Sequence, residues 1–324
     1  MANFADDIID VKVPPLVSVI LPTYNRASYI KASIQSVLQQ TFADLELIVV
    51  DDGSTDDTSS IVASVTDPRL RYVRQCNLGR SSARNHALSL ARGKFITFLD
   101  SDDLYLPRKI ELQVNYLNSH PGVGMIYTSS YCIDDLGTLL PDRYEATISG
   151  FIYEHIAFFT PVTITLPTVM TYKSILDQIG GFDEKLHRFE DTDMWRRISK
   201  GYRIDALPEY TCKIRAHKEN SLLNQRPDEI VANLEYYSRK IMRDDENISL
   251  EVRSRGLAAL YRYYAAAFLT VPSFSSRGVS LLKIANEFCS DHVKSIPVDK
   301  QSKTSIYKKA IGFIRVLRQR WRLW

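Results

Sequence analysis

The stretch Lys94-Phe95-Ile96-Thr97-Phe98-Leu99-Asp100-Ser101-Asp102-Asp103 joins a short apolar run to three carboxylates. Such a run of β-forming residues is typical of a parallel-sheet strand that is buried on both faces. The carboxyl end of such a strand opens into the crevice where α/β sheets bind ligands. We therefore expect the three aspartates to face a polar ligand, and a hard divalent cation with a diphosphate would offset their mutual repulsion. The alternative is an Asp-rich turn that caps the next helix.

Length, charge, cysteine content and apolar runs argue against a nucleic-acid-binding, zinc-binding, secreted or membrane-spanning protein. The chain has 324 residues, 45% hydrophobic and 24% charged, which suits one large domain with an appendage or two domains. A net charge of +3 is too small to predict a nucleic-acid partner. The four cysteines are far apart and form no Cys-x-x-Cys pair, which favours reduced thiols over a zinc site. The acidic start lacks a signal-peptide pattern, and no apolar run reaches the ~20 residues of a spanning helix, so we expect a cytoplasmic protein.

Strand-like and helix-like segments alternate in the first third of the chain. Strands are predicted at residues 16–21, 45–50, 70–73 and 94–99. Helices are predicted between them at residues 28–40, 57–65 and 79–92. This alternation predicts βαβ units, and therefore an α/β fold with a mainly parallel sheet flanked by helices. Because successive strand ends would then lie side by side, Tyr24, Asp52 and Asp102 are expected in one crevice, with Pro22 opening the turn after the first strand.

The pattern changes toward the C-terminus. Helices are predicted at residues 107–119, 174–179 and 191–200, strands at 124–128, 202–204 and 212–215, and irregular structure at 134–165. From Asp228 onward the pattern is helical. We therefore predict a catalytic or binding domain at residues 1–222 and a helical C-terminal region at residues 223–324.

Six short motifs, taken in order, resemble the family 2 glycosyltransferases with the GT-A fold. They are Val17-Ser18-Val19-Ile20-Leu21-Pro22-Thr23-Tyr24-Asn25, Val50-Asp51-Asp52-Gly53-Ser54-Thr55-Asp56, Gly79-x-x-x-Ala83-Arg84-Asn85, Leu99-Asp100-Ser101-Asp102-Asp103, Gly180-Gly181-Phe182-Asp183-Glu184 and Glu190-Asp191. The resemblance covers about residues 16 to 222. It implies an inverting hexosyl- or hexosaminyltransferase that uses a nucleotide-sugar donor, with a UDP-sugar favoured, and Mn²⁺ or Mg²⁺. It also implies a glycan or lipid-linked acceptor and a role in bacterial surface polysaccharide synthesis.

The resemblance assigns five residues to the nucleotide. Asp52 matches the carboxylate that accepts from the base edge, and Pro22 and Tyr24 match the first loop, which packs on the nucleoside. The alternative for Tyr24 is packing at the start of a helix. Arg84 follows Gly79 by one helical turn, where a guanidinium can reach a phosphate or a base carbonyl; the alternative is an ion pair with an aspartate at the sheet edge. Asp100 matches the ribose contact.

The same resemblance assigns the metal ligands and the catalytic base. Asp102, the later member of the Asp-x-Asp motif, matches the metal ligand, and His217 resembles a late histidine that contacts metal or diphosphate in some relatives. The alternative for His217 is a solvated loop residue. Asp191 matches the catalytic base that removes the acceptor proton; the alternative is that Glu190 and Asp191 only cap a helix. Asp103 is expected to cap the following helix.

The end of the chain lies outside the resemblance. Residues 306–324 combine helical apolar spacing with positive charge and terminal tryptophans, which suits peripheral binding to an anionic surface on the inner face of the cell membrane. Packing on the catalytic domain or on a second subunit is the alternative. The rival to an enzyme is a non-catalytic GT-A-like module that binds nucleotide or serves assembly. No glycine-rich triphosphate loop follows the first strand, so a nucleotidyltransferase is disfavoured.

Overall fold

The computed structural model describes residues 13–158, 164–216 and 226–290, with side chains described to residue 288. The strands are β1 (Val17–Thr23), β2 (Leu45–Asp51), β3 (Leu70–Arg74), β4 (Phe95–Phe98), β5 (Leu104–Tyr105), β6 (Val123–Ile133), β7 (Leu139–Tyr144), β8 (Met170–Tyr172) and β9 (Arg203–Arg215). The α-helices are α1 (Ile30–Leu38), α2 (Thr58–Ala63), α3 (Arg80–Leu90), α4 (Lys109–Ser119), α5 (Tyr153–Ala157), α6 (Lys173–Ile179), α7 (Glu190–Ser199), α8 (Pro227–Asp244), α9 (Leu250–Leu269) and α10 (Ser275–Ser290). Two 3₁₀ turns are η1 (Leu166–Thr168) and η4 (Pro272–Phe274).

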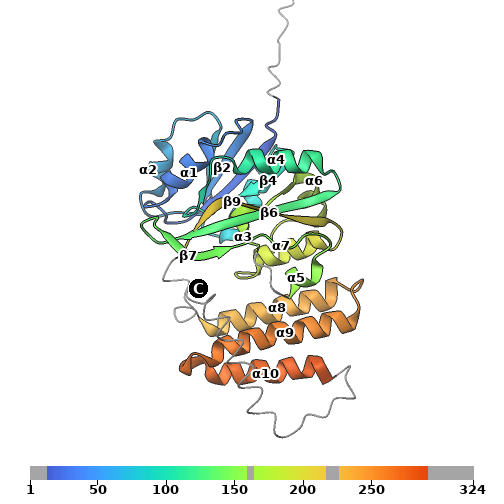
Figure 1. Ribbon diagram of the computed structural model, residues 1–324. Coiled ribbons are helices and arrows are strands. Elements are labelled where there is room, and N and C mark those ends of the chain that lie inside the picture. The colour runs from blue at the N-terminus through green and yellow to red at the C-terminus, as the bar shows by residue number, and fades with distance from the viewer. Residues whose placement is uncertain (1–12, 159–163, 217–225, 291–324) are drawn as a thin grey trace, which may run out of the picture.

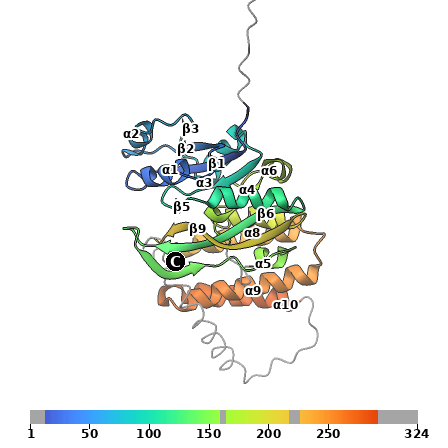
Figure 2. The same cartoon turned by 45° about the horizontal axis from the view of Figure 1, so that its top comes forward.

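The strands form one sheet in the order β3-β2-β1-β4-β8-β6-β9-β5, with β7 paired to β6. The half that contains β3, β2, β1 and β4 is entirely parallel. Beyond β4 the sheet is mixed, because β8 runs antiparallel to both β4 and β6 while β9 runs parallel to β6. Figure 2 shows β1, β2 and β3 at the opposite end of the molecule from α9 and α10. The α/β fold with helices on both faces of the sheet is confirmed.

Alternating side chains of the buried strands fill two cores. On one face, Ile20 and Ile48 pack with Ala83 and Ala87 of α3. On the other face, the neighbouring residue Val19 belongs to the core that α1 and α4 cover. Because successive side chains of a strand point to opposite faces, a strand buried on both faces reads as an uninterrupted apolar run.

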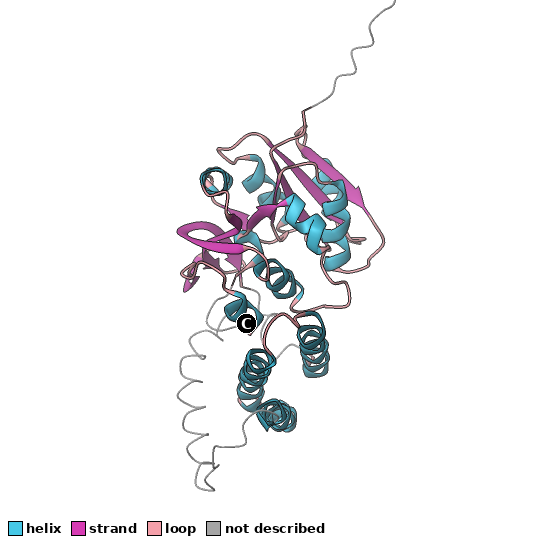
Figure 3. Cartoon of the chain, turned by 90° about the vertical axis from the view of Figure 1, so that its right-hand side faces the viewer, coloured by secondary structure: helices cyan, strands magenta, loops and turns pink. Residues whose placement is uncertain are grey.

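The helical region has a third core, which it shares with the loop before α7. Leu186 and Phe189 of that loop are buried together with Tyr237 of α8, Leu257 of α9 and Leu281 of α10. Figure 1 shows α7 between the sheet and α8, and Figure 3 shows α8, α9 and α10 on the side of α7 away from the strands. The helices after residue 226 agree with the predicted helical pattern, while the predicted boundary near residue 222 lies outside the described residues.

Three predicted elements differ from the structure. Pro22 lies inside β1 and pairs with Val50, whereas we expected it to open a turn. The strand tolerates this proline because β4 pairs with β1 only as far as Ile20, so that β1 has no neighbour on that side at Pro22. The two expected strands at 202–204 and 212–215 are one strand, β9, and the expected irregular stretch at 134–165 contains β7 and α5.

Among the described helices, none combines the length and the apolar character that crossing a membrane requires.

Candidate active site

The loops that follow β1, β2 and β4 gather at one edge of the sheet, because these strands are parallel neighbours. Hydrogen bonds join the first two loops. The backbone N–H of Asn25 donates to Ser54 Oγ at 2.9 Å, and Asn25 Oδ1 accepts from the backbone N–H of Thr55 at 2.8 Å. Asn25 has a φ of 51°, a left-handed conformation that asparagine adopts more readily than most residues. The two loops therefore form one connected rim.

Asp52 lies at the end of β2 and is nearly buried, with 4% of its surface exposed. Its carboxylate accepts from Gln75 Nε2 at 2.8 Å, from the backbone N–H of Leu78 at 2.9 Å and from that of Gly79 at 2.8 Å. An ionised carboxylate has about four acceptor positions, so Asp52 retains capacity for a further donor. These contacts fix Asp52 against the turn that leads into α3.

Pro22 and Tyr24 differ in their exposure to solvent. Pro22 is buried within β1, whereas Tyr24 is 43% exposed just beyond the strand. The ring of Tyr24 is therefore available for stacking on a planar ligand, and its role in nucleotide binding stays a prediction.

Arg84 of α3 connects two motifs that lie far apart in the sequence. Its guanidinium is 3% exposed and donates through Nη2 to Asp100 at 2.8 Å and through Nη1 to Glu190 at 3.1 Å. It also lies over the ring of Phe182, 5.3 Å from its centroid. The ion pair with a sheet-edge aspartate, which we held as the alternative for Arg84, is thus present. The contact brings the Asp-x-Asp motif beside the Glu190-Asp191 pair.

The carboxylates after β4 remain accessible at the edge of the sheet. The side chains of Asp100 and Asp102 are 36% and 16% exposed, and Asp102 Oδ2 accepts from Arg26 Nε at 3.2 Å. Burial, together with the charges of Asp102 and Asp100, raises the pKa of Asp103 well above its ordinary value. The three carboxylates are therefore close enough to destabilise one another's charge.

Asp103 does not cap the next helix, contrary to our expectation. Helix α4 begins at Lys109, and no side chain caps it. Asp103 Oδ1 instead accepts the backbone N–H of Arg215 at 2.8 Å, and Arg215 Nε donates to the carbonyl of Asp102 at 3.0 Å. Arg215, at the end of β9, thus holds the backbone of the Asp-x-Asp motif in place.

Asp191 lies in the first turn of α7 and is half-buried. Burial raises the pKa of its carboxyl to about 6, and the charge of Glu190 adds to this rise. Its Oδ1 accepts the backbone N–H of Thr192 at 2.6 Å. A carboxylate with such a pKa is mostly ionised at neutral pH and is a stronger base than an exposed aspartate.

The donor set at the sheet edge fits a hard divalent cation. Asp100 and Asp102 offer carboxylate oxygens, and Mg²⁺ commonly binds through one or two carboxylates together with substrate phosphates. In the described part of the chain, no three His, Cys, Asp or Glu side chains form a cage for a metal ion, so phosphate oxygens would have to complete the coordination. The predicted ligand His217 lies outside the described residues.

Sequence reasoning assigned no role to Arg26 or Arg215 and read Glu190 only as a partner of the base. Arg215 is separated from Asp103 by 112 positions, so no local pattern could have indicated their contact. A role for Arg26 could have been predicted from its position in the first loop, close to residues already assigned to the nucleotide.

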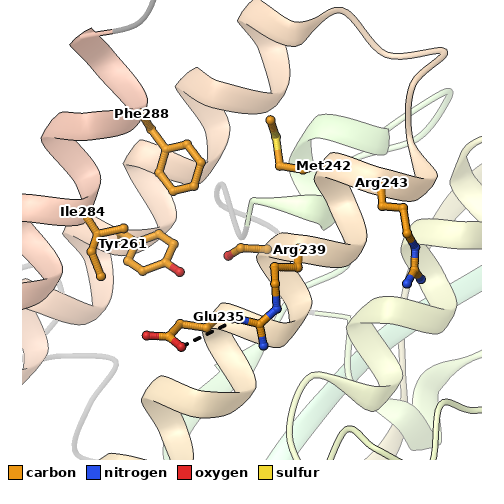
Figure 4. Close-up of a pocket in the computed structure, with 8 residues that line it drawn as sticks. Glu235, Arg239, Met242, Arg243, Tyr261, Ile284 and Phe288 are labelled. Carbon is orange, nitrogen blue, oxygen red and sulfur yellow. Dashed lines mark ion pairs between the residues drawn. The ribbon is translucent and has the colours of Figure 1, made fainter.

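A groove of about 530 Å³ lies elsewhere, between α8, α9 and α10 (Figure 4). Arg239 and Met242 of α8, Tyr261 of α9 and Phe288 of α10 line it. Its lining includes none of the residues at the strand ends, so it is not part of the candidate active site.

Comparisons with known proteins find sequence relatives that match about two thirds of the chain. The family model described as "Glycosyl transferase family 2" matches residues 18–180. An uncharacterized glycosyltransferase of Methanocaldococcus jannaschii is 33% identical over 223 residues, which are 65% of this chain and 74% of that protein. An uncharacterized glycosyltransferase of Rickettsia bellii is 35% identical over 221 residues, which are 68% of this chain but only 31% of the relative. Chondroitin synthase of Escherichia coli is 35% identical over 199 residues, 59% of this chain and 27% of the synthase.

Solved structures share the fold. The structure of S. aureus TarS 1–349 in complex with UDP has a TM-score of 0.61 at 19% identity and covers 88% of this chain and 94% of that chain. The same protein in complex with UDP-GlcNAc has a TM-score of 0.60 at 18% identity, with the same coverage. The mannosyltransferase PcManGT from Pyrobaculum calidifontis, in complex with GDP-Man and Mn²⁺, has a TM-score of 0.51 at 21% identity and covers 97% of this chain and 84% of that chain. The likeness shows a fold of GT-A type.

Proposed function

The chain belongs to glycosyl transferase family 2, and from that premise we propose that it transfers a sugar, with inversion, from a nucleotide-diphosphate sugar to a hydroxyl group of a glycan or lipid-linked acceptor. The observation that carries this proposal is the position of Arg84, which pairs with Asp100 and Glu190 at once. A nucleotide-sugar held by Asp52 and Asp100 would place its reactive sugar beside Asp191. The donor and the base would then meet in one site although their residues lie far apart in the sequence.

Each side chain has a role in this reaction. Asp52 accepts from the base edge, Tyr24 and Pro22 pack on the nucleoside, and Asp100 contacts the ribose. Asp191 removes the proton from the acceptor hydroxyl as the oxygen attacks the anomeric carbon opposite the leaving nucleotide. Its pKa of about 6 leaves it ionised at pH 7 and ready to accept that proton.

Asp102 would hold a Mn²⁺ or Mg²⁺ ion, because its carboxylate offers hard oxygen donors at the strand end. Such an ion, when bound, supplies Lewis-acid stabilisation of the charge that develops on the diphosphate. Arg26, whose side chain is 38% exposed and forms an ion pair with Asp102, would contribute positive charge on the same side.

Known structures of this fold support a nucleotide-sugar donor. TarS binds UDP and UDP-GlcNAc, and PcManGT binds GDP-Man with Mn²⁺. Among the sequence relatives, chondroitin synthase and the hyaluronan synthase of Pasteurella multocida are named for polysaccharides. We therefore propose a UDP-sugar as the donor and a surface polysaccharide as the product.

Calorimetric titration tests the donor site. UDP, dTDP and GDP are titrated into the wild-type protein and into Asp102→Asn, with and without Mn²⁺. We expect saturable binding of UDP that strengthens with Mn²⁺ in the wild type and loses this dependence in the variant. If folded wild-type protein binds none of the nucleotides, the chain is a non-catalytic module and the proposal fails.

A further inference from the structure

One face of α8 contacts the loop that presents the proposed base. Asn233, Tyr236, Tyr237 and Lys240 are spaced by three and four residues, so they project from the same side of the helix. We call these four residues the loop-holding face. Each of them contacts residues 183–193, the segment that runs from the Gly-Gly-Phe-Asp motif into α7.

The polar members of this face bind the start and the middle of the loop. Tyr236 donates its hydroxyl to Asp183 at 3.1 Å, and Lys240 Nζ donates to the same carboxylate at 2.6 Å. Burial acts to raise the pKa of Asp183, but these hydrogen bonds, that of Lys240 foremost, hold it below its ordinary value. Lys240 also reaches Asp193 of α7 at 3.0 Å. The lysine therefore connects the loop to the helix that carries Asp191.

Asn233 holds the last turn before the proposed base. Its side-chain oxygen accepts the backbone N–H of His187 at 2.9 Å and that of Arg188 at 3.2 Å. Asn233 is 8% exposed, so these bonds are sheltered from water. This one side-chain oxygen therefore accepts from both of these backbone donors of the turn.

Phe189 then turns the chain into α7 in an unfavourable conformation. Its φ is 66°, in the left-handed region that bulky side chains rarely adopt. Its ring is buried 5.6 Å from the ring of Tyr237 and 5.7 Å from that of Tyr264 of α9, measured between centroids. Its carbonyl accepts the backbone N–H of Asp193 at 2.7 Å, the first hydrogen bond of α7. Burial of the ring between two helices thus offsets a strained backbone two residues before Asp191.

We propose that the loop-holding face of α8 sets the position of Asp191 for proton abstraction, with Asn233 as the positioning residue. The inference rests on the proposed function, in which Asp191 is the base. The helical region would then be a part of the catalytic apparatus. A shift of the turn at residues 187–189 would rotate the first turn of α7 and displace Asp191 relative to Arg84 and the donor. Displacements of about 1 Å can lower a rate about 100-fold.

The same helix offers a matched control. Glu235, Arg239 and Met242 project from the opposite side of α8, where they line the groove with α9 and α10 (Figure 4). The side chain of Arg239 is 69% exposed, and its ion pair with Glu235 spans 3.9 Å. A substitution there changes α8 without touching the loop before Asp191.

The experiment compares Asn233→Leu, Asn233→Asp and Arg239→Gln with the wild type in the full-length protein. Asn233→Leu removes the acceptor, and Asn233→Asp keeps an acceptor oxygen for both backbone N–H groups. For each variant we would measure UDP affinity by calorimetry, and kcat and KM for the donor across pH 5 to 9. Hydrogen exchange of the amides at residues 186–193 would be followed in parallel.

We expect Asn233→Leu to lower kcat by about 10- to 100-fold, with unchanged UDP affinity and donor KM and with a displaced acidic limb of the pH profile. Exchange at residues 186–193 should accelerate. Asn233→Asp should recover most of kcat, and Arg239→Gln should match the wild type throughout.

Two results would overturn the positioning role. The first is a loss of kcat in Asn233→Leu that is fully explained by the fraction of unfolded protein. In that case the pH profile would be unchanged, and the kcat of Asn233→Asp would be as low as that of Asn233→Leu. The other is unchanged hydrogen exchange at residues 186–193. If wild-type protein neither binds nucleotide nor transfers sugar, the proposed function fails, and the exchange data still decide whether Asn233 holds the turn.

Discussion

Two clusters of charge flank α7, and they differ in how deeply their aspartates are buried. The sheet-edge site contains Asp100 and Asp102, with side chains 36% and 16% exposed. The second cluster, which we call the interhelix network, consists of Asp183, Asp193, Arg196, Arg197, Lys200, Lys240 and Asp245. Its aspartates Asp193 and Asp245 are 0% exposed. The difference indicates that the charges of the interhelix network hold α8 against α7, whereas those of the sheet-edge site remain accessible to solvent.

The interhelix network joins α8 and the residue that follows it to α7. Arg196 of α7 pairs with Asp193 at 2.8 Å and with Asp245, which follows α8. Lys200 reaches Asp245 at 2.9 Å. Burying such charges is tolerable only because each has an opposite partner at hydrogen-bonding distance. The network therefore specifies how α8 lies on α7.

The largest effect is expected from Asp191→Asn, in the first turn of α7. Loss of the general base should lower the transfer rate by about 10³-fold or more, while donor binding persists. The folded protein holds a proton on Asp191 up to a pKa of about 6, above the ordinary 3.8. The stability that this protonated form contributes is present at low pH and lost as the pH rises through 6, so asparagine should raise the Tm at pH 7.

Single-turnover rates and differential scanning calorimetry would check this prediction. A variant that keeps its rate would exclude Asp191 as the base.

In the interhelix network, we expect Arg196→Met to lower the free energy of unfolding. The substitution leaves Asp193 and Asp245 without their shared partner in a buried setting, which costs about 3–5 kcal/mol. Urea unfolding followed by circular dichroism would measure the loss. A change below about 1 kcal/mol would mean that the remaining cations, such as Lys240 and Lys200, suffice to hold the two helices together.

The pH dependence of the reaction should reflect the ionisation of Asp191 and not that of Asp193 in the interhelix network. Because Asp191 must be ionised to accept a proton, the rate should be level above pH 6 and fall tenfold for each unit below it. Asp193 has its pKa held below its ordinary value, since the charges of Arg196, Arg197 and Lys240 outweigh its burial. It should remain ionised throughout this range. A rate that is level down to pH 5, in protein whose fold is intact by circular dichroism, would contradict the role of Asp191.

The smallest effect is expected at an exposed ion pair between α8 and α10. Arg277 of α10 binds Asp228 at 2.5 Å, but the two side chains are 38% and 75% exposed. Water screens such pairs, so Arg277→Ala should shift the urea midpoint far less than Arg196→Met does. Urea unfolding of this variant and of Arg196→Met, measured under the same conditions, would compare the two losses of stability. Equal losses would show that burial does not distinguish the two ion pairs.

The sequence predicted those features of the candidate site that depend on a short continuous stretch of residues. The strand-to-carboxylate junctions at Asp52 and Asp100 were readable because a strand buried on both faces must be apolar and its end must turn polar at the edge of the sheet. The acid-rich start of α7 was readable in the same way, since carboxylates suit the positive end of a helix. The extent of β9 was not, because its exposed central residues interrupt the apolar pattern.

Local sequence thus determined the alternation of strands and helices, the parallel half of the sheet and the gathering of Tyr24, Asp52 and Asp102 at its edge. Tertiary structure alone decided that Arg84 joins Asp100 to Glu190 and that Asn233 of α8 holds the turn before Asp191. The physical reason is the direction of side chains. Periodicity tells which residues share a face of a helix, but the partner of that face depends on how helices 40 or more positions apart pack together.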